Sequence, residues 1–420
     1  MLLRESGIYC FLSKLEEKML DGEYGEAYAL AMSAIVKLGE LYEAKKLIKI
    51  SSVHIDASTY GGIYDAGLQL CEKLAEANVS FQVPATLCIS AIDFEKWQKL
   101  GIPEDYANKQ IKLAEAYKKL GAIPTWTCAP YQCIWNLRFG QDIAWGESNA
   151  VAFVNSVIGA RTNRCADLID VCAAITGRFP KFGLHLKENR KGDVLFKIKN
   201  LKAKTLSTAD YAALGYYIGK SLKDEIPVIS GVNKNVNNDQ LKSFGAAAAS
   251  SGAVALFHMI GITPEAKNLR SAFQGDKPKD KIEIGIEELR KTKDELSSSI
   301  QNPEAIILGC PHYSLDELRL IAKYLKDKKI KPQIRLLIFI NKATKLLAEE
   351  QGYIEIIEKA GGEILTGTCL LHFHRNAVNF NTIMTDSAKM AHYAPNIHKL
   401  NVIFNDLKSC LKVAIGKNKN

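Results

Sequence analysis

Short apolar runs alternate with amphipathic helical stretches along most of the chain, and this alternation limits the fold more than any other feature. The runs have the length and the Val, Ile and Leu content of buried strands. They are KLIKI (46–50), VSFQVP (79–84), IPTWTC (123–128), EIPVISG (225–231), VALFHM (254–259), AIILG (305–309) and IRLLIFI (334–340). Strands separated by helices form βαβ units, which build parallel sheets. The sequence therefore predicts an α/β protein.

A chain of 420 residues has room for roughly three domains. The most linker-like stretch is FQGDKPKDKIEIG (273–285), where charged residues, Gly and Pro concentrate. We therefore expect one part over 1–283, which holds two possibly interleaved domains, and a second part over 284–420, which holds a third domain with a C-terminal return segment. The elements expected in this second part are helix 285–300, strand 305–308, helix 315–328, strand 335–340, helix 341–360 and strand 363–366.

Composition and charge exclude several classes of protein. Arg4, Glu5 and Lys14 interrupt the apolar N-terminal stretch, which is therefore typical of neither a signal peptide nor a membrane span. Ten cysteines without a secretory signal indicate free thiols in a reducing cytoplasm rather than a disulfide framework. The net charge of +9 is spread over scattered lysines, so we expect no nucleic-acid binding and no membrane association.

Cys310 stands out because it follows the apolar run 305–308 and precedes a capping box formed by Ser314 and Glu317. It should lie on a strand-to-helix loop, where ligands bind in open α/β sheets. Cys128 and Cys369 also follow strand-like runs, so we expect all three to end strands. Their wide spacing is unlike that of zinc or ferredoxin motifs, and the residues alone leave both packing and metal binding open. We assign packing roles to Cys10, Cys71, Cys165, Cys172 and Cys410.

Longer motifs over nearly the whole chain are specific when taken together. They are DGEYGEA, SSVHIDASTYGGIYDAGL, GIPEDYANKQ, TWTCAPY, AWGESNAVAFVNSVIGARTNR, GLHLKENR, LKSFGAAAASSGAVALFHMIGITPEA, GCPHYSLDEL and MTDSAKMAHYAPN. With these motifs the chain resembles the aconitase X family, and within it the archaeal large subunits. The resemblance implies an aconitase-like fold of three Rossmann-like αβα domains around a central iron-sulfur cleft.

The resemblance also implies the site residues. Cys128, Cys310 and Cys369 would bind an iron-sulfur cluster, most simply of the 4Fe-4S type with one iron left open. The implied substrate contacts are Ala57, Ser58, Thr59, Cys88, Ile89, Glu147, Ser148 and Lys389. Among these we expect Glu147 and Ser148 to be catalytic, because a carboxylate in a cleft can have a raised pKa. Lys389 offers a compact positive charge, and the DAST segment offers small side chains and backbone N–H groups for an anion.

The activity implied by the resemblance is that of a hydro-lyase, which dehydrates the phosphorylated hydroxy acid mevalonate 5-phosphate to trans-anhydromevalonate 5-phosphate in isoprenoid synthesis. The resemblance further implies a separate small subunit with the swivelling domain and a serine base. Only about 25 residues follow Pro395, too few for that domain. Two alternatives stay open: a cis-3-hydroxy-L-proline dehydratase on the same scaffold, and a non-catalytic aconitase-like protein that senses iron or RNA.

The sequence departs from the family pattern at two implied substrate positions. Ala57 and Ser58 stand where the family usually has Gly and Val, and Cys88 and Ile89 stand where it usually has Asn and Pro. Replacing an amide that hydrogen-bonds a substrate by a thiol changes which substrates a site discriminates. The exact substrate therefore stays open at this point.

Overall fold

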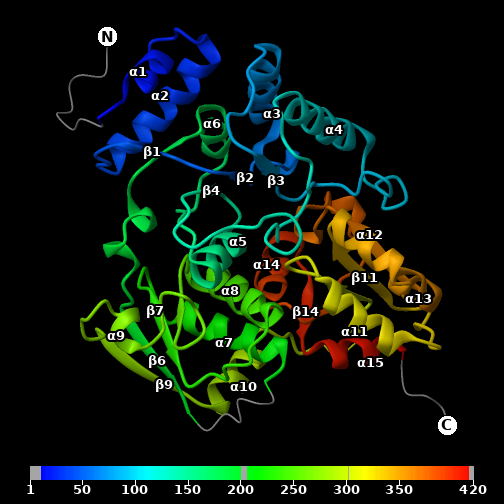
Figure 1. Cartoon of the computed structure of the whole chain (residues 1–420). Coiled ribbons are helices and arrows are strands. Elements are labelled where there is room, and N and C mark those ends of the chain that lie inside the picture. Colours follow the sequence, from blue (N-terminus) through cyan, green and yellow to red (C-terminus); the bar gives the residue numbers. More distant parts are fainter. Residues whose placement is uncertain (1–10, 200–205, 301, 416–420) are drawn as a thin grey trace.

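The computed structural model describes residues 11–199, 206–300 and 302–415, which form three α/β units (Figure 1). Each unit has its own parallel sheet, and helices cover the sheets. In Figure 1 the first unit runs from blue through cyan to green, the second from green to yellow-green and the third from yellow to red. The α/β class expected from the alternating pattern is therefore confirmed.

The first unit is built on a three-stranded parallel sheet with the strand order β3-β2-β4. Its strands are β2 (Val53–Ile55), β3 (Ala85–Leu87) and β4 (Ala144–Trp145), and an antiparallel pair is formed by β1 (Leu47–Lys49) and β5 (Arg178–Pro180). Its helices are α1 (Lys14–Leu20), α2 (Glu26–Leu41), α3 (Tyr60–Glu76), α4 (Glu104–Lys119), α5 (Ser148–Phe153) and α6 (Ile169–Thr176). Helix α4 has acidic residues in its first turn and lysines in its last, which favours it through the helix dipole.

The second unit has a four-stranded parallel sheet with the order β8-β7-β6-β9. Its strands are β6 (Val194–Ile198), β7 (Pro227–Ser230), β8 (His258–Met259) and β9 (Asp280–Ile284), and its helices are α7 (Thr208–Lys220), α8 (Asn238–Gly252), α9 (Leu269–Ala272) and α10 (Ile286–Glu295). Helices α7 and α8 pack closely because small residues face each other: a Cβ atom at Gly252 would lie 1.8 Å from the carbonyl oxygen of Gly219.

The expected boundary at residue 284 coincides with the end of β9. Strand β9 pairs with β6, and α10, which follows it, packs against α7 of the second unit. The helix expected at 285–300 thus lies with the second unit, whereas the sheet of the third unit begins at Ala305. The division into 1–283 and 284–420 stays a prediction.

The third unit has a five-stranded parallel sheet with the order β12-β11-β10-β13-β14. Its strands are β10 (Ala305–Leu308), β11 (Arg335–Ile340), β12 (Gly362–Thr366), β13 (Thr382–Thr385) and β14 (Asn401–Phe404), and its helices are α11 (Leu315–Leu325), α12 (Lys342–Glu350), α13 (Tyr353–Ala360), α14 (Ala388–His398) and α15 (Leu407–Ile415). All four residues of the central strand β10 are buried. The helix expected at 341–360 is two helices, because the chain turns at Gly352, whose φ is +70°.

Two of the expected strands are absent from the described structure. The run 79–84 precedes β3 instead of forming it, and the run 123–128 makes a single bridge, between Ile123 and Thr86. Pro124 has no N–H to continue that ladder, and Trp126 has a φ of +45°. Cys128 therefore lies in a loop, and the expectation that it ends a strand is wrong.

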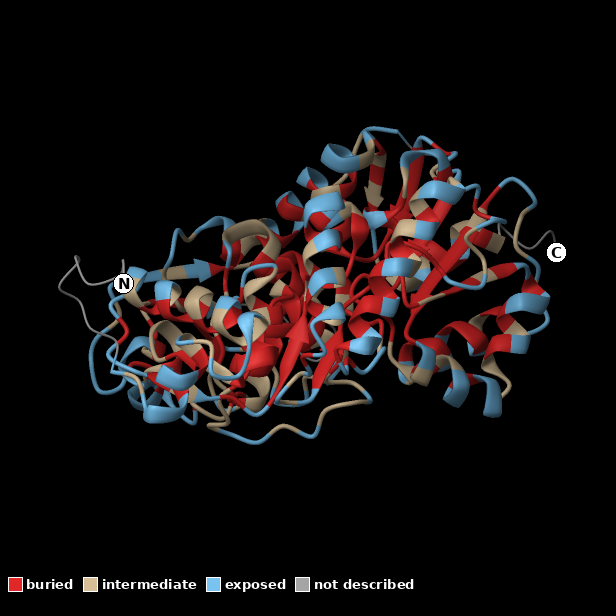
Figure 2. Cartoon of the chain, turned by 90° about the horizontal axis from the view of Figure 1, so that it is seen from above, coloured by how far each residue is buried: buried red, intermediate tan, exposed pale blue. Residues whose placement is uncertain are grey.

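The three units meet at a shared core. The largest cluster of buried hydrophobic residues draws on all three, with Phe153 from the first, Phe196 from the second and Ile307 from the third. Figure 2 shows buried residues running through the sheets and the middle of the molecule, with exposed residues on the outer helices. None of the helices in the described ranges has the length and hydrophobicity that a bilayer crossing requires.

Candidate active site at the junction of the three units

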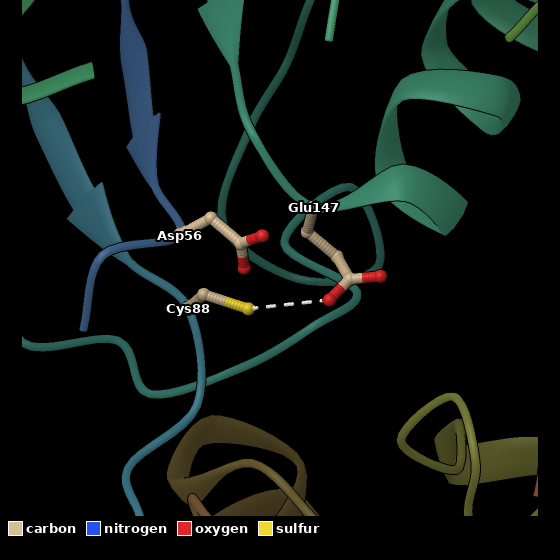
Figure 3. A group of neighbouring side chains, drawn as sticks. All are labelled: Asp56, Cys88 and Glu147. Atoms are coloured by element: carbon tan, nitrogen blue, oxygen red, sulfur yellow. Dashed lines mark hydrogen bonds between the residues drawn. The ribbon is translucent and has the colours of Figure 1, made fainter. Parts of the chain in front are cut away.

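Three polar side chains meet at the carboxyl ends of the three parallel strands of the first unit. Asp56 follows β2, Cys88 follows β3 and Glu147 follows β4 after Gly146. One side-chain atom of each of the three lies within 4.8 Å of the others, and the Cys88 thiol donates to Glu147 Oε2 at 3.7 Å (Figure 3). A Cβ atom at position 146 would lie 2.5 Å from Cβ of Asp56, so glycine leaves the room that Asp56 occupies.

Glu147 is held as an anion by Lys389, which comes from the first turn of α14. Lys389 Nζ lies 2.6 Å from Glu147 Oε1, and the Asn149 side chain donates to the same oxygen at 2.6 Å. Burial opposes ionisation of Glu147, but the Lys389 charge and these hydrogen bonds outweigh it and lower the pKa to about 2. The raised pKa expected for a carboxylate in this cleft is therefore wrong, because the sequence does not show the pairing with Lys389.

Asp56 has the opposite tendency. Burial of its carboxyl, followed by the nearby charges of Glu147, Asp167 and Asp170, raises its pKa well above the usual value, while a hydrogen bond from Cys88 lowers it only in part. Asp56 as a whole residue is half-buried. The pKa values of two neighbouring carboxyl groups are thus shifted in opposite directions, upward for Asp56 and downward for Glu147, as in acid-base sites.

Three cysteine loops lie beside this pair. Cys310 follows β10, Cys369 follows β12 and Cys128 lies in the loop between α4 and β4, and each is at most 9% exposed. The Cys310 and Cys369 thiols are hydrogen-bonded to each other, and Cys128 interacts electrostatically with both. All three are free thiols. The structure therefore brings together the three cysteines that lie far apart in the sequence.

The loop of Cys310 depends on the residue before it. Gly309 has a φ of +95°, and a Cβ atom there would lie 2.2 Å from the carbonyl oxygen of Phe339 on β11. The loop then enters α11 through the expected capping box, in which Ser314 Oγ accepts from the backbone N–H of Glu317 at 3.2 Å. This glycine turns the chain sharply after β10, so that Cys310 lies at the carboxyl end of the sheet of the third unit.

The donor set fits the iron-sulfur group that the resemblance implies. Three buried thiols without a disulfide are the ligands that such a group takes. A hydrogen bond with Cys369 lowers the pKa of Cys310, burial opposes this effect, and the positive charge of Lys389 and a hydrogen bond from Ser387 add to it. Lys389 would also partly balance an anionic group there.

Asp56, Cys88 and Glu147 form a second set of possible metal ligands. Glu147 is already bonded to the ammonium group of Lys389, whose positive charge opposes a further cation. The three-cysteine set is therefore the better metal site.

The backbone N–H groups of the segment 56–59, which we expected to bind an anion, are partly used in hydrogen bonds within the protein. The backbone N–H of Ala57 donates to Asp170 Oδ2 at 3.2 Å, and that of Ser58 donates to the carbonyl of Asp56 at 2.6 Å. The Ser58 hydroxyl donates to the carbonyl of Ile89 at 2.7 Å, so it joins two implied substrate segments to each other. These groups shape the wall of the site, but their N–H donors are already used.

The remaining expected contacts lie around the same strand ends. Thr59 is the buried N-cap residue of α3, and Ile89 is buried beside Cys88. The Ser148 hydroxyl donates to Glu147 Oε1 at 3.3 Å, so both expected catalytic residues belong to one hydrogen-bonded network. Of the cysteines assigned to packing, Cys71, Cys165 and Cys410 are buried and Cys172 is half-buried. Cys10 lies outside the described residues.

Comparison with known families decides the relationship. The chain matches the aconitase X first domain over residues 10–188, the second domain over 192–294 and the third domain over 303–416. The chain belongs to the aconitase X family. The match covers each unit described above, and the aconitase-like fold of three domains is thereby confirmed.

Individual aconitase X proteins are similar over almost the whole chain. The phosphomevalonate dehydratase large subunit of Methanocaldococcus jannaschii is 40% identical over 96% of this chain and 99% of that protein. The cis-3-hydroxy-L-proline dehydratase of Pseudomonas aeruginosa is 38% identical over 96% of this chain and 70% of that protein. The crystal structure of Thermococcus kodakaraensis aconitase X in its holo-form has a TM-score of 0.87 and 36% identity, and the match covers 96% of this chain and 100% of that one. The expectation of a dehydratase is confirmed at the level of the family.

Two residues of the site were missed from the sequence. Asp56 stands directly before the segment Ala57 to Thr59, and its place after a strand-like stretch was the available signal. His312 stands two residues after Cys310 and is fully buried in the structure. A histidine two residues after the candidate ligand Cys310 was visible in the sequence, but its hydrogen-bond partners come from other loops.

Proposed function

We propose that this chain is the large subunit of an iron-sulfur hydro-lyase that converts mevalonate 5-phosphate into trans-anhydromevalonate 5-phosphate. The observation that carries the proposal is the convergence of the loops of Cys128, Cys310 and Cys369 beside the Glu147–Lys389 pair. Support comes from archaeal relatives named phosphomevalonate dehydratase large subunit, which are similar over 96% of this chain. Their names support a separate small subunit, and the free described cysteines support a reducing cytoplasm.

Cys128, Cys310 and Cys369 would hold the cluster, for which we propose the 4Fe-4S type. When bound, it supplies a Lewis acid at one open iron for the leaving hydroxyl group. Lys389 and Glu147 form a fixed charge pair next to these ligands, with side chains 12% and 11% exposed. The pair orients the substrate and stays ionised through the reaction, while Ser148 extends its hydrogen bonding.

Loss of water from the substrate breaks a C–H bond at C2 and the C–O bond at C3. We assign the proton that leaves with the C3 hydroxyl to the carboxyl group of Asp56, whose pKa is raised by burial and by the neighbouring Glu147 carboxylate. The proton at C2 then goes to a base on the small subunit, and the C2–H electron pair forms the double bond as hydroxide leaves as water. Because Asp56 and the small-subunit base transfer the two protons, Glu147 orients the substrate and transfers none.

The second candidate is dehydration of cis-3-hydroxy-L-proline, the activity named for the relative from Pseudomonas aeruginosa. The observation that favours it is the pair of carboxyl groups, Asp56 and Glu147, on either side of the Cys88 thiol. Their oxygens can accept hydrogen bonds from a substrate ammonium, whereas a phosphate group offers acceptors of its own. Cys88, which stands where the family usually has Asn, lies between these two carboxyl groups in the same cluster of side chains.

The test is an anaerobic assay of the chain reconstituted with iron and sulfide, mixed with its small subunit, and given each substrate in turn. We expect water loss from mevalonate 5-phosphate and none from cis-3-hydroxy-L-proline. Cys128→Ser should abolish turnover, and the exposed Cys133→Ser should leave it unchanged. Turnover of the hydroxyproline alone would replace the proposed substrate with the second candidate.

A further inference from the structure

His312 connects three loops that are far apart in the sequence. It lies two residues after Cys310, in the loop between β10 and α11, and it is fully buried. Its backbone N–H donates to Cys128 Sγ at 3.3 Å. Its ring nitrogens contact the residues that precede Cys128 and Cys369. Nδ1 lies 3.2 Å from Thr127 Oγ1, and Nε2 lies 2.8 Å from the carbonyl oxygen of Thr368.

The partners define which ring nitrogen of His312 carries the proton. The carbonyl oxygen of Thr368 can only accept, so Nε2 donates to it. Nδ1 then has no proton and accepts from the Thr127 hydroxyl, which in turn accepts from the backbone N–H of Ala129. One neutral imidazole therefore joins the residue before Cys128 to the residue before Cys369.

The backbone carbonyl of His312 is also tied down. It accepts from Lys242 Nζ at 3.3 Å and from Gln132 Nε2 at 3.2 Å. Lys242 belongs to α8 of the second unit and forms a buried ion pair with Glu317 of α11 at 2.5 Å. All four polar groups of His312 are thus engaged, so its position is fixed by all three units.

We propose that His312 is a positioning residue that holds the three cysteine loops in place before the iron-sulfur group binds. The inference rests on the proposed function only for the identity of that group. Hydrogen bonds around ligating sulfurs orient the ligands and tune the potential of the metal. The N–H of His312 makes such a bond to Cys128, while its ring keeps Cys128 and Cys369 at a fixed separation.

The test compares His312→Phe, which keeps a planar, somewhat larger ring and removes both ring bonds, with His312→Gln, whose amide can still donate to Thr368. The matched control is His258→Phe, because His258 is equally buried and its Nε2 lies 2.8 Å from the carbonyl of Arg190, in the second unit. The first readout uses protein without iron in which every variant also carries Cys310→Ser, because Cys310 is hydrogen-bonded to Cys369 and would otherwise compete. It is the rate at which the short reagent dibromobimane joins Cys128 to Cys369. The second is the rate at which a chelator removes iron from the loaded protein, together with the midpoint potential.

We expect His312→Phe to slow the cross-linking and to speed the loss of iron by on the order of 10- to 100-fold, with a shifted potential. His312→Gln should lie between wild type and His312→Phe, and His258→Phe should match wild type. Unchanged cross-linking and iron loss in a folded His312→Phe would overturn the proposal. If that variant does not fold, Thr127→Val decides, since it removes only one partner of the ring: unchanged rates would overturn the proposal, and faster iron loss would support it.

The two readouts separate this inference from the proposed function. If wild type takes up no iron, the proposed function fails, whereas the cross-linking in protein without iron still measures whether His312 organises the loops. If wild type is active and the His312 variants behave as wild type in both readouts, the inference alone fails.

Discussion

Removing Lys389 should leave the buried Glu147 carboxylate without its partner, and the cost can be worked out from the site. The pKa of Glu147 is lowered from 4.5 to about 2 by Lys389 and the Asn149 hydrogen bonds against the effect of burial, and at ~1.4 kcal/mol per unit this net change corresponds to roughly 3 to 4 kcal/mol of stability. Breaking one side of a buried ion pair typically costs about 3 to 5 kcal/mol, which agrees. We therefore expect Lys389→Met to destabilise the protein by about 3 kcal/mol at pH 7.

The assay is calorimetric unfolding of the protein without iron, so that metal loss does not contribute. A loss of this size should lower the melting temperature by about 6 to 12 °C, at roughly 2 to 4 °C per kcal/mol for a unit of 150 to 250 residues. The double variant Lys389→Met/Glu147→Gln removes the uncompensated charge, so it should recover most of the loss. A single variant no less stable than the double one would refute the reasoning.

The pH dependence follows from the direction of the shift. A carboxylate whose pKa is lowered on folding stabilises the protein above its unfolded pKa of 4.5, and this stability is lost as the pH falls toward the folded value of about 2. The difference between wild type and Lys389→Met should therefore be full at pH 7 and shrink below pH 4.5. A constant difference down to pH 2 would show that the variant acts through packing alone.

Two further predictions concern the turn and the proton donor. Gly309→Ala should destabilise the protein by about 1 to 3 kcal/mol more than the control Gly352→Ala, because both have positive φ but only position 309 lacks room for a Cβ atom; equal melting temperatures would contradict this. Asp56→Asn should lower kcat by roughly 100-fold or more with little change in KM, and it should remove the loss of activity seen as the pH rises through the raised pKa of Asp56. An unchanged alkaline limb would exclude Asp56 as the donor.

The sequence predicted those strands and helices whose residues form a local pattern, such as an apolar run or a capping box. The run Ala305–Leu308 is β-branched and apolar and is followed by a serine and a glutamate at capping spacing, and the structure has β10 and α11 there. The run 123–128 has similar composition, but Pro124 and the positive φ of Trp126 keep it out of the sheet. Composition alone does not show that the two runs also differ in burial: Ile123 and Pro124 are exposed, whereas all four residues of Ala305–Leu308 are buried.

The candidate site was harder to predict because its contacts join distant residues. Cys128, Cys310 and Cys369 were chosen through family resemblance, since their spacing carries no metal signal. The pairing of Glu147 with Lys389 spans 242 positions and reverses the expected direction of the Glu147 pKa. Likewise, no local pattern indicates that the N–H groups of Ala57 and Ser58 are already bonded within the protein.

The most direct test of the central claim is the iron and sulfide content of the chain after anaerobic reconstitution, measured by native mass spectrometry. The account predicts one cluster per chain in wild type and in Cys133→Ser. Cys133 is the matched control because its thiol is exposed, whereas those of Cys128, Cys310 and Cys369 are buried. It predicts loss of the cluster in Cys128→Ser, Cys310→Ser and Cys369→Ser. A full cluster in all three of these variants would contradict the account.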